Sequence, residues 1–249
     1  MIQLTIIKIT GYGPWTLTLG SDREHKLQML QSSLYKEIQK LFSEKNCLVF
    51  ANRFDELFVI TNGLSLNDHV EIQKKLKESF ELELSMTIGY GQSPFEANLQ
   101  ADKARKSKTL LNKDLNIFGF VNGKSEQTVN IMHMDVDGST SISAKKSPYE
   151  ISSLMFKLYS EMLEFFLSQN SLTFFMGGDN FMIISSPTGK ENATKFLELI
   201  EKKYGVSMNC GIGTAKTARE AANLATKSLD TIREMRDSGK TQRVLELTC

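Results

Sequence analysis

Apolar residues recur at two spacings along this chain of 249 residues. Short apolar or alternating runs bounded by glycine and Asx residues predict strands, and apolar positions three to four residues apart predict helices. The helical spacing is clearest in two stripes: Leu27, Leu30, Leu34, Ile38 and Leu41, and then Ile151, Leu154, Leu158, Met162 and Phe165. Each stripe predicts a helix that packs one face against a sheet.

The same element order is predicted twice: strand, helix, hairpin, helix, strand, helix. In the first half, the ranges are 2–9, Asp22–Lys45, 47–61, Val70–Phe80, 82–91 and 96–106. In the second half, they are 129–138, Tyr149–Ser168, 171–185, Asn192–Tyr204, 206–213 and 220–232. Both halves therefore follow a βαββαβ order with one more helix at the end.

Local sequence repeats along with this order. SMTIGYG at Ser85–Gly91 matches SMNCGIG at Ser207–Gly213, and EANLQA from Glu96 matches EAANLA from Glu220. Such self-similarity indicates a tandem duplication. We expect an α+β fold of two ferredoxin-like βαββαβ domains, each an antiparallel sheet with helices on one face. The expected boundaries are 1–114, a linker at 115–128, and 129–249.

Two motifs predict where the long helices begin. Ser21-Asp-Arg-Glu24 and Ser147-Pro-Tyr-Glu150 each place a glutamate three residues after a serine, as in a capping box. The second motif adds a proline at the first helical position, where its fixed φ is favourable. We therefore expect both serines to cap helices.

Composition limits the function classes. Hydrophobic residues make up 41% of the chain, charged residues 24%, and the formal net charge is +1, which gives no electrostatic case for nucleic acid or an anionic membrane. No apolar run approaches the roughly 18 residues of a membrane span, and the N-terminus predicts a strand rather than a secretion signal. The scattered Cys47, Cys210 and Cys249 fit thiols in a reducing compartment. We expect a cytoplasmic protein.

A basic run follows the first repeat and has two interpretations. It is either a solvated helix face or a surface that contacts phosphate or RNA. No aromatic residues are interleaved with it, so the solvated face is favoured. The run comprises Lys103, Arg105, Lys106, Lys108 and Lys113.

In the second half, acidic residues lie at the end of the first predicted strand and at the tip of the predicted hairpin. In a βαββαβ sheet the hairpin tip lies beside the end of the first strand, so Asp179 of the GGDN tip is expected near Asp135. Alternation along the strand puts Asp137 on the same side as Asp135. Carboxylates this close repel one another unless a cation joins them, and two aspartates leave room on Mg²⁺ for water and phosphate oxygens. Gly177 and Gly178 let a ligand approach the backbone.

Each motif also has a simpler interpretation. DxDG at a strand end is commonly a turn, and Asp137 can instead cap the next helix. The combination of Asp135 and Asp179 on adjacent elements favours a metal and nucleotide site. His133, on an apolar strand, is interpreted as a hydrogen-bonded core histidine. No set of histidines and cysteines has zinc-site spacing, so any metal here is a hard ion held by oxygen.

The first half departs from this acidic pattern. Residue counting puts Thr10 in the place of Asp135 and keeps only Asp55, the counterpart of Asp179, so metal binding is not expected there. Trp15 can stack on a base, and a carboxylate can pair with the hydrogen-bond donors of guanine. The alternatives are a core or subunit-interface role for Trp15 and a simple cross-turn ion pair between Arg53 and Asp55.

The chain resembles the archaeal GTP cyclohydrolase III family of the palm-like nucleotidyl cyclase superfamily. The matching segments are Tyr12–Thr16 (YGPWT), Arg23-Glu24, Leu27–Tyr35, Arg53–Leu57 (RFDEL), Phe174–Met182 (FFMGGDNFM) and Gly211–Ala225. The resemblance implies a homo-oligomeric enzyme that uses Mg²⁺, as two ions, with K⁺ as activator. It implies hydrolysis of GTP with opening of the imidazole ring, retention of the formyl group and release of the outer phosphates. The product is a formylamino-pyrimidine ribonucleotide monophosphate, early in riboflavin and deazaflavin synthesis.

Site roles follow from the resemblance residue by residue. Asp135 and Asp179 would hold metal and act in catalysis with Asn180. Gly177 and Gly178 would lie beside the phosphates of the substrate. From the residues themselves rather than the resemblance, Trp15, Arg53, Asp55 and Asp137 are further candidates for substrate contact. Two other functions remain open: a nucleotidyl cyclase-like enzyme that uses the same aspartates, and a non-catalytic guanine-nucleotide sensor.

Overall fold

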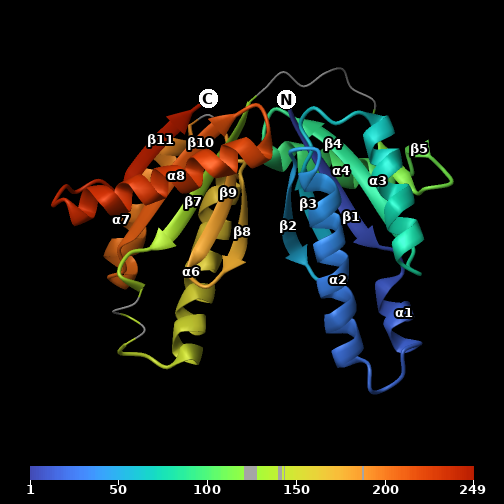
Figure 1. The fold of residues 1–249 in the computed structure, drawn as a ribbon, viewed down its shortest axis with the longest axis horizontal. Helices are drawn as coiled ribbons and strands as arrows, with labels where there is room; N and C mark the ends of the chain where they lie inside the picture. Colours follow the sequence, from blue (N-terminus) through green and yellow to red (C-terminus); the bar gives the residue numbers. More distant parts are fainter. Residues whose placement is uncertain (121–127, 140–141, 143, 187) are drawn as a thin grey trace. The chain divides into compact units, whose positions relative to one another are not determined.

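The computed structural model describes residues 1–120, 128–139, 142, 144–186 and 188–249. The chain forms two compact units, Met1–Gln92 with Glu96–Gln127 and Ser93–Phe95 with Thr128–Cys249. The described part of each unit contains one sheet (Figure 1).

The first unit follows the predicted order and adds short elements. Its sheet has the order β2-β3-β1-β4-β6-β5, with β1 and β4 in the centre. The elements are β1 (Ile2–Ile9), α1 (Tyr12–Leu17), α2 (Glu24–Ser43), β2 (Leu48–Arg53), β3 (Glu56–Ile60), α3 (Leu66–Ser79), β4 (Leu84–Gly91), α4 (Pro94–Lys106), β5 (Leu110–Asn112) and β6 (Ile117–Gly119).

The second unit repeats the same core. Its sheet has the order β11-β10-β7-β9-β8, so the first strand, β7, pairs with both β9 and β10. The elements are β7 (Val129–Val136), α6 (Pro148–Ser168), β8 (Leu172–Gly177), β9 (Asn180–Ser185), α7 (Gly189–Tyr204), β10 (Met208–Ala215), α8 (Ala218–Asp237) and β11 (Val244–Thr248). The α+β class and the duplicated βαββαβ core are confirmed.

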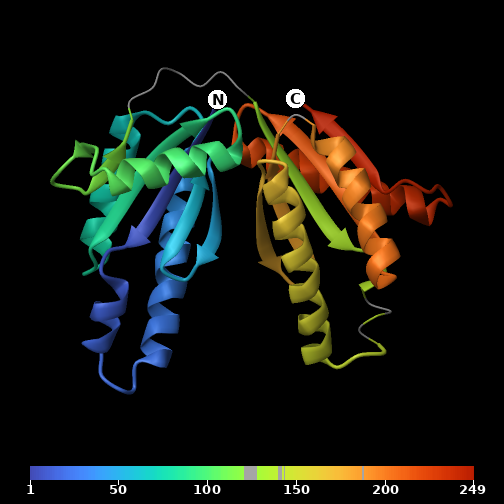
Figure 2. The ribbon, with the colours of Figure 1, turned by 180° about the vertical axis from the view of Figure 1, so that it is seen from behind.

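Helices cover both faces of each sheet, so the prediction of helices on one face is wrong. In the second unit, α6 and α7 share an apolar core with one face of the sheet, and α8 packs on the opposite face. Figure 1 shows α8 in front of its strands, and Figure 2 shows α6 and α7 in front. The reason lies in β10, whose Gly211 and Gly213 let the α8 backbone approach closely on the face away from that core. In the first unit, α4 packs on β4 at Gly89 in the same way.

The sheets are also not purely antiparallel. β6 pairs parallel to β4, and β11 pairs parallel to β10. In the second unit α8 connects the two strands, and such a helical crossover gives parallel pairing. In the first unit the chain passes through α4 and β5 before β6, which pairs antiparallel with β5. The predicted linker 115–128 overlaps β6, and its part at 121–127 lies outside the described residues.

The two predicted capping boxes have different outcomes. Ser147 caps α6, because its Oγ accepts from the Glu150 backbone N–H and the Glu150 carboxylate accepts from the Ser147 N–H at 2.8 Å. The Ser21 box is wrong. α2 begins at Glu24, so this glutamate is the first helical residue rather than the third, and the N-cap Arg23 makes no side-chain cap.

The three cysteines are all free thiols. Cys47 and Cys210 are buried, and Cys249 is exposed. Burial raises the pKa of the Cys47 thiol to about 12, so this thiol stays protonated at neutral pH. Within the described ranges, no helix is both long and apolar enough to cross a membrane.

Candidate functional site

The GGDN segment forms the turn between β8 and β9. Gly177 pairs with Asn180 across the hairpin, so Gly178 and Asp179 form the tip. Gly177 and Gly178 have φ values of +98° and +62°, a region that side chains disfavour and glycine adopts freely. The two glycines are therefore needed to make the turn. The turn then places the Asp179 carboxylate where it accepts a 2.9 Å hydrogen bond from the Asn180 amide.

Asp135 lies beside this turn, directly opposite Asn180 on the neighbouring strand. Its side chain is 7% exposed, and its Oδ2 accepts a 2.6 Å hydrogen bond from Arg233 on α8. Its Oδ1 is buried without a hydrogen-bond partner among the described residues. Asp137 pairs with Arg236, one turn further along α8, so both aspartates face α8 as strand alternation predicts.

His133 joins this cluster through both ring nitrogens. Its Nε2 lies 3.0 Å from Asn180 Oδ1, and its Nδ1 lies 3.1 Å from the Thr226 hydroxyl on α8. The Asn180 amide nitrogen already donates to Asp179, so His133 Nε2 donates to the amide oxygen, and in a neutral ring Nδ1 then accepts from the Thr226 hydroxyl. Burial lowers the pKa of His133, which favours this neutral form. The ring therefore fixes the orientation of Asn180.

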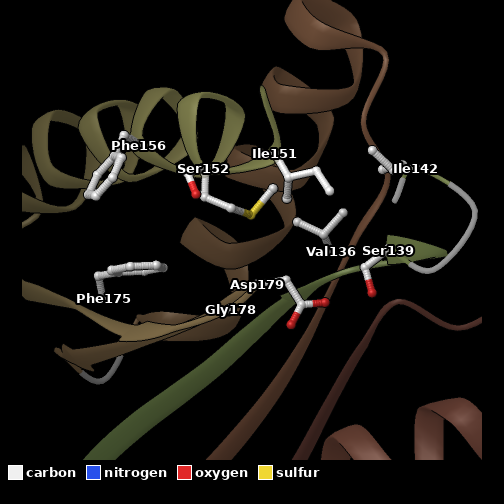
Figure 3. Close-up of a pocket in the computed structure, with 10 residues that line it drawn as sticks. Val136, Ser139, Ile142, Ile151, Ser152, Phe156, Phe175, Gly178 and Asp179 are labelled. Carbon is white, nitrogen blue, oxygen red and sulfur yellow. The ribbon is translucent and has the colours of Figure 1, made fainter. Parts of the chain in front are cut away.

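A pocket of about 420 Å³ opens on the other side of the hairpin, between the tip, α6 and the end of β7. In Figure 3, Phe156 and Phe175 lie at one end, and Asp179 and Ser139 lie toward the other. The centroids of the two rings are 5.7 Å apart, and the angle between the ring planes is 54°. The remaining lining residues are Val136, Ile142, Ile151, Ser152, Met155 and Gly178. Such a pocket can bury a flat apolar ring and hold charged groups near a carboxylate.

The described side chains would supply only some of the ligands that a hard cation needs. Within the described part of the chain, no group of three His, Cys, Asp or Glu residues could hold a metal. Asp135 and Asp179 supply two carboxylates at neighbouring backbone positions, and the buried Oδ1 of Asp135 has no other described partner. Magnesium commonly binds proteins through one or two carboxylates and takes its other ligands from water and phosphate. Two carboxylates and a substrate phosphate would therefore suffice.

The first unit carries a different pair at the equivalent position. Lys8 lies opposite Glu56 on β3, as Asp135 lies opposite Asn180, and the two side chains form an ion pair at 3.2 Å. Lys8, rather than Thr10, is therefore the counterpart of Asp135. The segment before the hairpin is longer in the first unit, so counting residues back from the hairpin misaligned the strands.

The predicted match between SMTIGYG at Ser85–Gly91 and SMNCGIG at Ser207–Gly213 was also out of register by two residues. Gly89 contacts the helix backbone at Ala97 and Ala101, and Gly213 makes the equivalent contacts with Ala221 and Ala225. Gly89 thus matches Gly213 rather than Gly211. A slip of two residues keeps every side chain on its own face of a strand, so the repeated glycine spacing hides it.

The other predicted residues of the first unit lie near its hairpin and α1. Arg53 and Asp55 form the cross-turn ion pair, at 2.9 Å. Trp15 is partly buried on α1, and its ring centroid lies 6.1 Å from that of Tyr12. In the basic run, Arg105 and Lys106 both pair with Asp102 on α4.

The sequence-based prediction missed the residues that α8 and α6 bring to the site. Arg233 and Arg236 lie beyond the predicted end of the last helix at Ile232. The segment REMRD continues the helix without glycine or proline and could have extended the prediction. Phe156 was not identified because its ring is half exposed and lies outside the apolar stripe of α6.

The chain matches the model of the family described as GTP cyclohydrolase III over residues 1–245. It is 34% identical over 239 residues to a GTP cyclohydrolase III of Methanothermobacter thermautotrophicus, covering 94% of this chain and 95% of that one. It is 36% identical over 245 residues to one of Methanocaldococcus jannaschii, covering 94% and 88%. The chain belongs to the GTP cyclohydrolase III family. This membership confirms the resemblance carried by the YGPWT and GGDNF motifs and the prediction of a hydrolase.

Solved structures give more distant similarities. A bacterial light-regulated adenylyl cyclase is 10% identical with a TM-score of 0.44, covering 99% of this chain and 85% of that chain. An active GGEEF domain of a diguanylate cyclase from Vibrio cholerae is 15% identical with a TM-score of 0.35, covering 61% and 92%.

Proposed function

We propose that this protein hydrolyses GTP with Mg²⁺, opening the imidazole ring and releasing the outer phosphates. The observation that carries the proposal is the pocket beside the GGDN turn, which joins an aromatic end to a carboxylate end. The product would be a formylamino-pyrimidine ribonucleotide monophosphate, early in riboflavin and deazaflavin synthesis. Family membership and the relatives' names support GTP as the substrate.

The pocket suggests how the nucleotide would bind. The guanine ring would lie against Phe156 and Phe175, where an apolar wall favours a flat ring. The triphosphate would then extend toward Asp179 and the backbone of Gly177 and Gly178, which has no side chains to block it. Asp137 would lie beside the phosphates on the α8 side, together with the arginine that pairs with it.

The metal would be held by Asp135 and Asp179. Two Mg²⁺ ions would neutralise the phosphates and supply an activated water, with K⁺ as an additional activator. Asn180, held in one orientation by His133, would keep the Asp179 carboxylate in place. In the first unit the ammonium group of Lys8 stands at the position of Asp135 and pairs with Glu56, which disfavours a metal ion there. We therefore place catalysis in the second unit, and substrate contacts of Trp15, Arg53 and Asp55 in the first unit stay a prediction.

Product analysis tests this function directly. Purified protein is incubated with GTP, Mg²⁺ and K⁺, and the products are identified by mass and by phosphate release. We expect a ring-opened monophosphate that retains the formyl carbon. An intact imidazole ring in every product would overturn the proposal, with a cyclic or linked nucleotide and pyrophosphate indicating a cyclase. Unchanged GTP would indicate a sensor.

Variants locate the chemistry. Asp135→Asn and Asp179→Asn remove one metal-binding charge each while keeping the side-chain shape, and each should lower turnover at least about 100-fold. The control is Asp22→Asn, which removes the same charge from an exposed position in the first unit. If either site variant keeps near-normal turnover, its aspartate is not a metal ligand.

A further inference from the structure

The second unit has a helical extension that the first unit lacks. Matching Ala101 of α4 to Ala225 of α8 aligns the two helices by their contacts with Gly89 and Gly213. In this alignment α4 ends at Lys106, before the level of Arg233, whereas α8 continues to Asp237. The extension therefore occurs only in the unit that has the aspartates.

The extension carries the two arginines that hold those aspartates. Arg233 binds Asp135 Oδ2 at 2.6 Å, and Arg236 pairs with Asp137. Arg233 also binds Asp230 on its own helix at 2.9 Å. The two arginine side chains are 43% and 50% exposed, so the ion pairs are solvated enough to exchange. Both guanidinium groups are thus paired with carboxylates and remain partly exposed to solvent.

A guanidinium and a divalent cation compete for the same carboxylate. Like charges this close disfavour one another, so an ion bound to Asp135 would weaken the contact with Arg233. A released guanidinium is well suited to phosphate, because its planar donors match two phosphate oxygens at once. The triphosphate end of the proposed substrate would provide such oxygens.

We propose that Arg233 and Arg236 act as a latch: they pair with Asp135 and Asp137 in the nucleotide-free protein and move to the nucleotide's phosphates when a divalent cation binds Asp135. This inference rests on the proposed function, since it takes a metal-bound nucleoside triphosphate as the ligand. The latch offsets the charges of Asp135 and Asp137 without substrate and makes tight metal binding depend on the nucleotide.

Metal binding without nucleotide tests the latch. Mn²⁺ is titrated into the nucleotide-free protein, and the free ion is followed by electron paramagnetic resonance. Arg233→Gln should bind Mn²⁺ about five- to tenfold more tightly than the wild type, because the competing charge is gone. The same variant should bind GTP with Mn²⁺ about tenfold more weakly, because a phosphate contact is lost.

Two further variants separate the latch from a general charge or folding effect. Lys227→Gln removes the same charge from an exposed position on α8, and its Mn²⁺ affinity should stay within about twofold of the wild type. Arg233→Lys keeps the charge without the planar donors. It should restore weak metal binding in the free protein, but only part of the GTP affinity.

The outcomes distinguish this inference from the proposed function. Unchanged or weaker Mn²⁺ binding in folded Arg233→Gln overturns the latch, even if the protein hydrolyses GTP. Tighter Mn²⁺ binding that persists when Asp135→Asn is added also overturns it, because the competition must act through that carboxylate. Unchanged GTP with the wild type rejects the proposed function, whereas the metal titration still decides the latch.

Discussion

The packing of α8 on β10 depends on Gly211. A Cβ placed there would lie 2.1 Å from the Ala225 backbone oxygen and 2.7 Å from the Leu229 backbone nitrogen. Neither atom can rotate away as a side chain could, so Gly211→Ala must push the helix off the sheet by about 1 Å in a closely packed interior. The same displacement would draw Arg233 away from Asp135.

The expected cost follows from this overlap. Forcing an added methyl group into a filled core typically costs about 1–3 kcal/mol, and backbone atoms as neighbours put Gly211→Ala at the upper end, about 3 kcal/mol. For a chain of this size, that lowers Tm by about 10 °C. Thermal unfolding of the ligand-free protein, followed by circular dichroism, measures the shift.

A second glycine provides the control. A Cβ at Gly13 would meet nothing within 4 Å, and its φ is not positive, so Gly13→Ala in α1 should not lower Tm and should raise it by at most about 4 °C. If Gly211→Ala lowers Tm by less than about 2 °C, the close approach of α8 to β10 does not contribute to stability in the way the packing requires. The placement of the α8 arginines at the aspartates would then lose its support.

Two further predictions address the pocket and the acid stability of the first unit. Phe156→Ala should raise KM for GTP about tenfold with kcat changed less than about threefold, because a base contact is lost while the metal site stays intact. Leu163→Ala is the control, since Leu163 is exposed on α6 but does not line the pocket. An equal rise in KM in the two variants would contradict the prediction. The Asp68 carboxylate accepts hydrogen bonds from Ser65 and Lys45, which lower its pKa to about 2. Since the folded-state pKa is depressed, its contribution of about 1 kcal/mol is present above about pH 4 and is lost as the pH falls toward 2. The Tm difference between Asp68→Ala and the wild type should therefore narrow over that range, and a difference that does not change with pH would refute the assignment.

The sequence predicted the core of both units because each element has a strong local signal. Apolar spacing identified the long helices α2 and α6, and the glycines with Asp179 identified the hairpin at the site of the second unit. The tandem order followed from repetition of these signals. The serine and glutamate before α6 predicted its capping box because a cap is made within a few residues.

Pairing and packing could not be obtained in this way. A slip of two residues leaves the pattern of apolar and polar positions unchanged, so only the strand register shows that Lys8 stands where the second unit has Asp135. The face that α8 covers, and hence the contact between Arg233 and Asp135, depends on how closely two backbones approach across the sheet. The sequence by itself determined the elements and the acids at their ends, and only the tertiary structure decided their partners, because those contacts join residues distant in the chain.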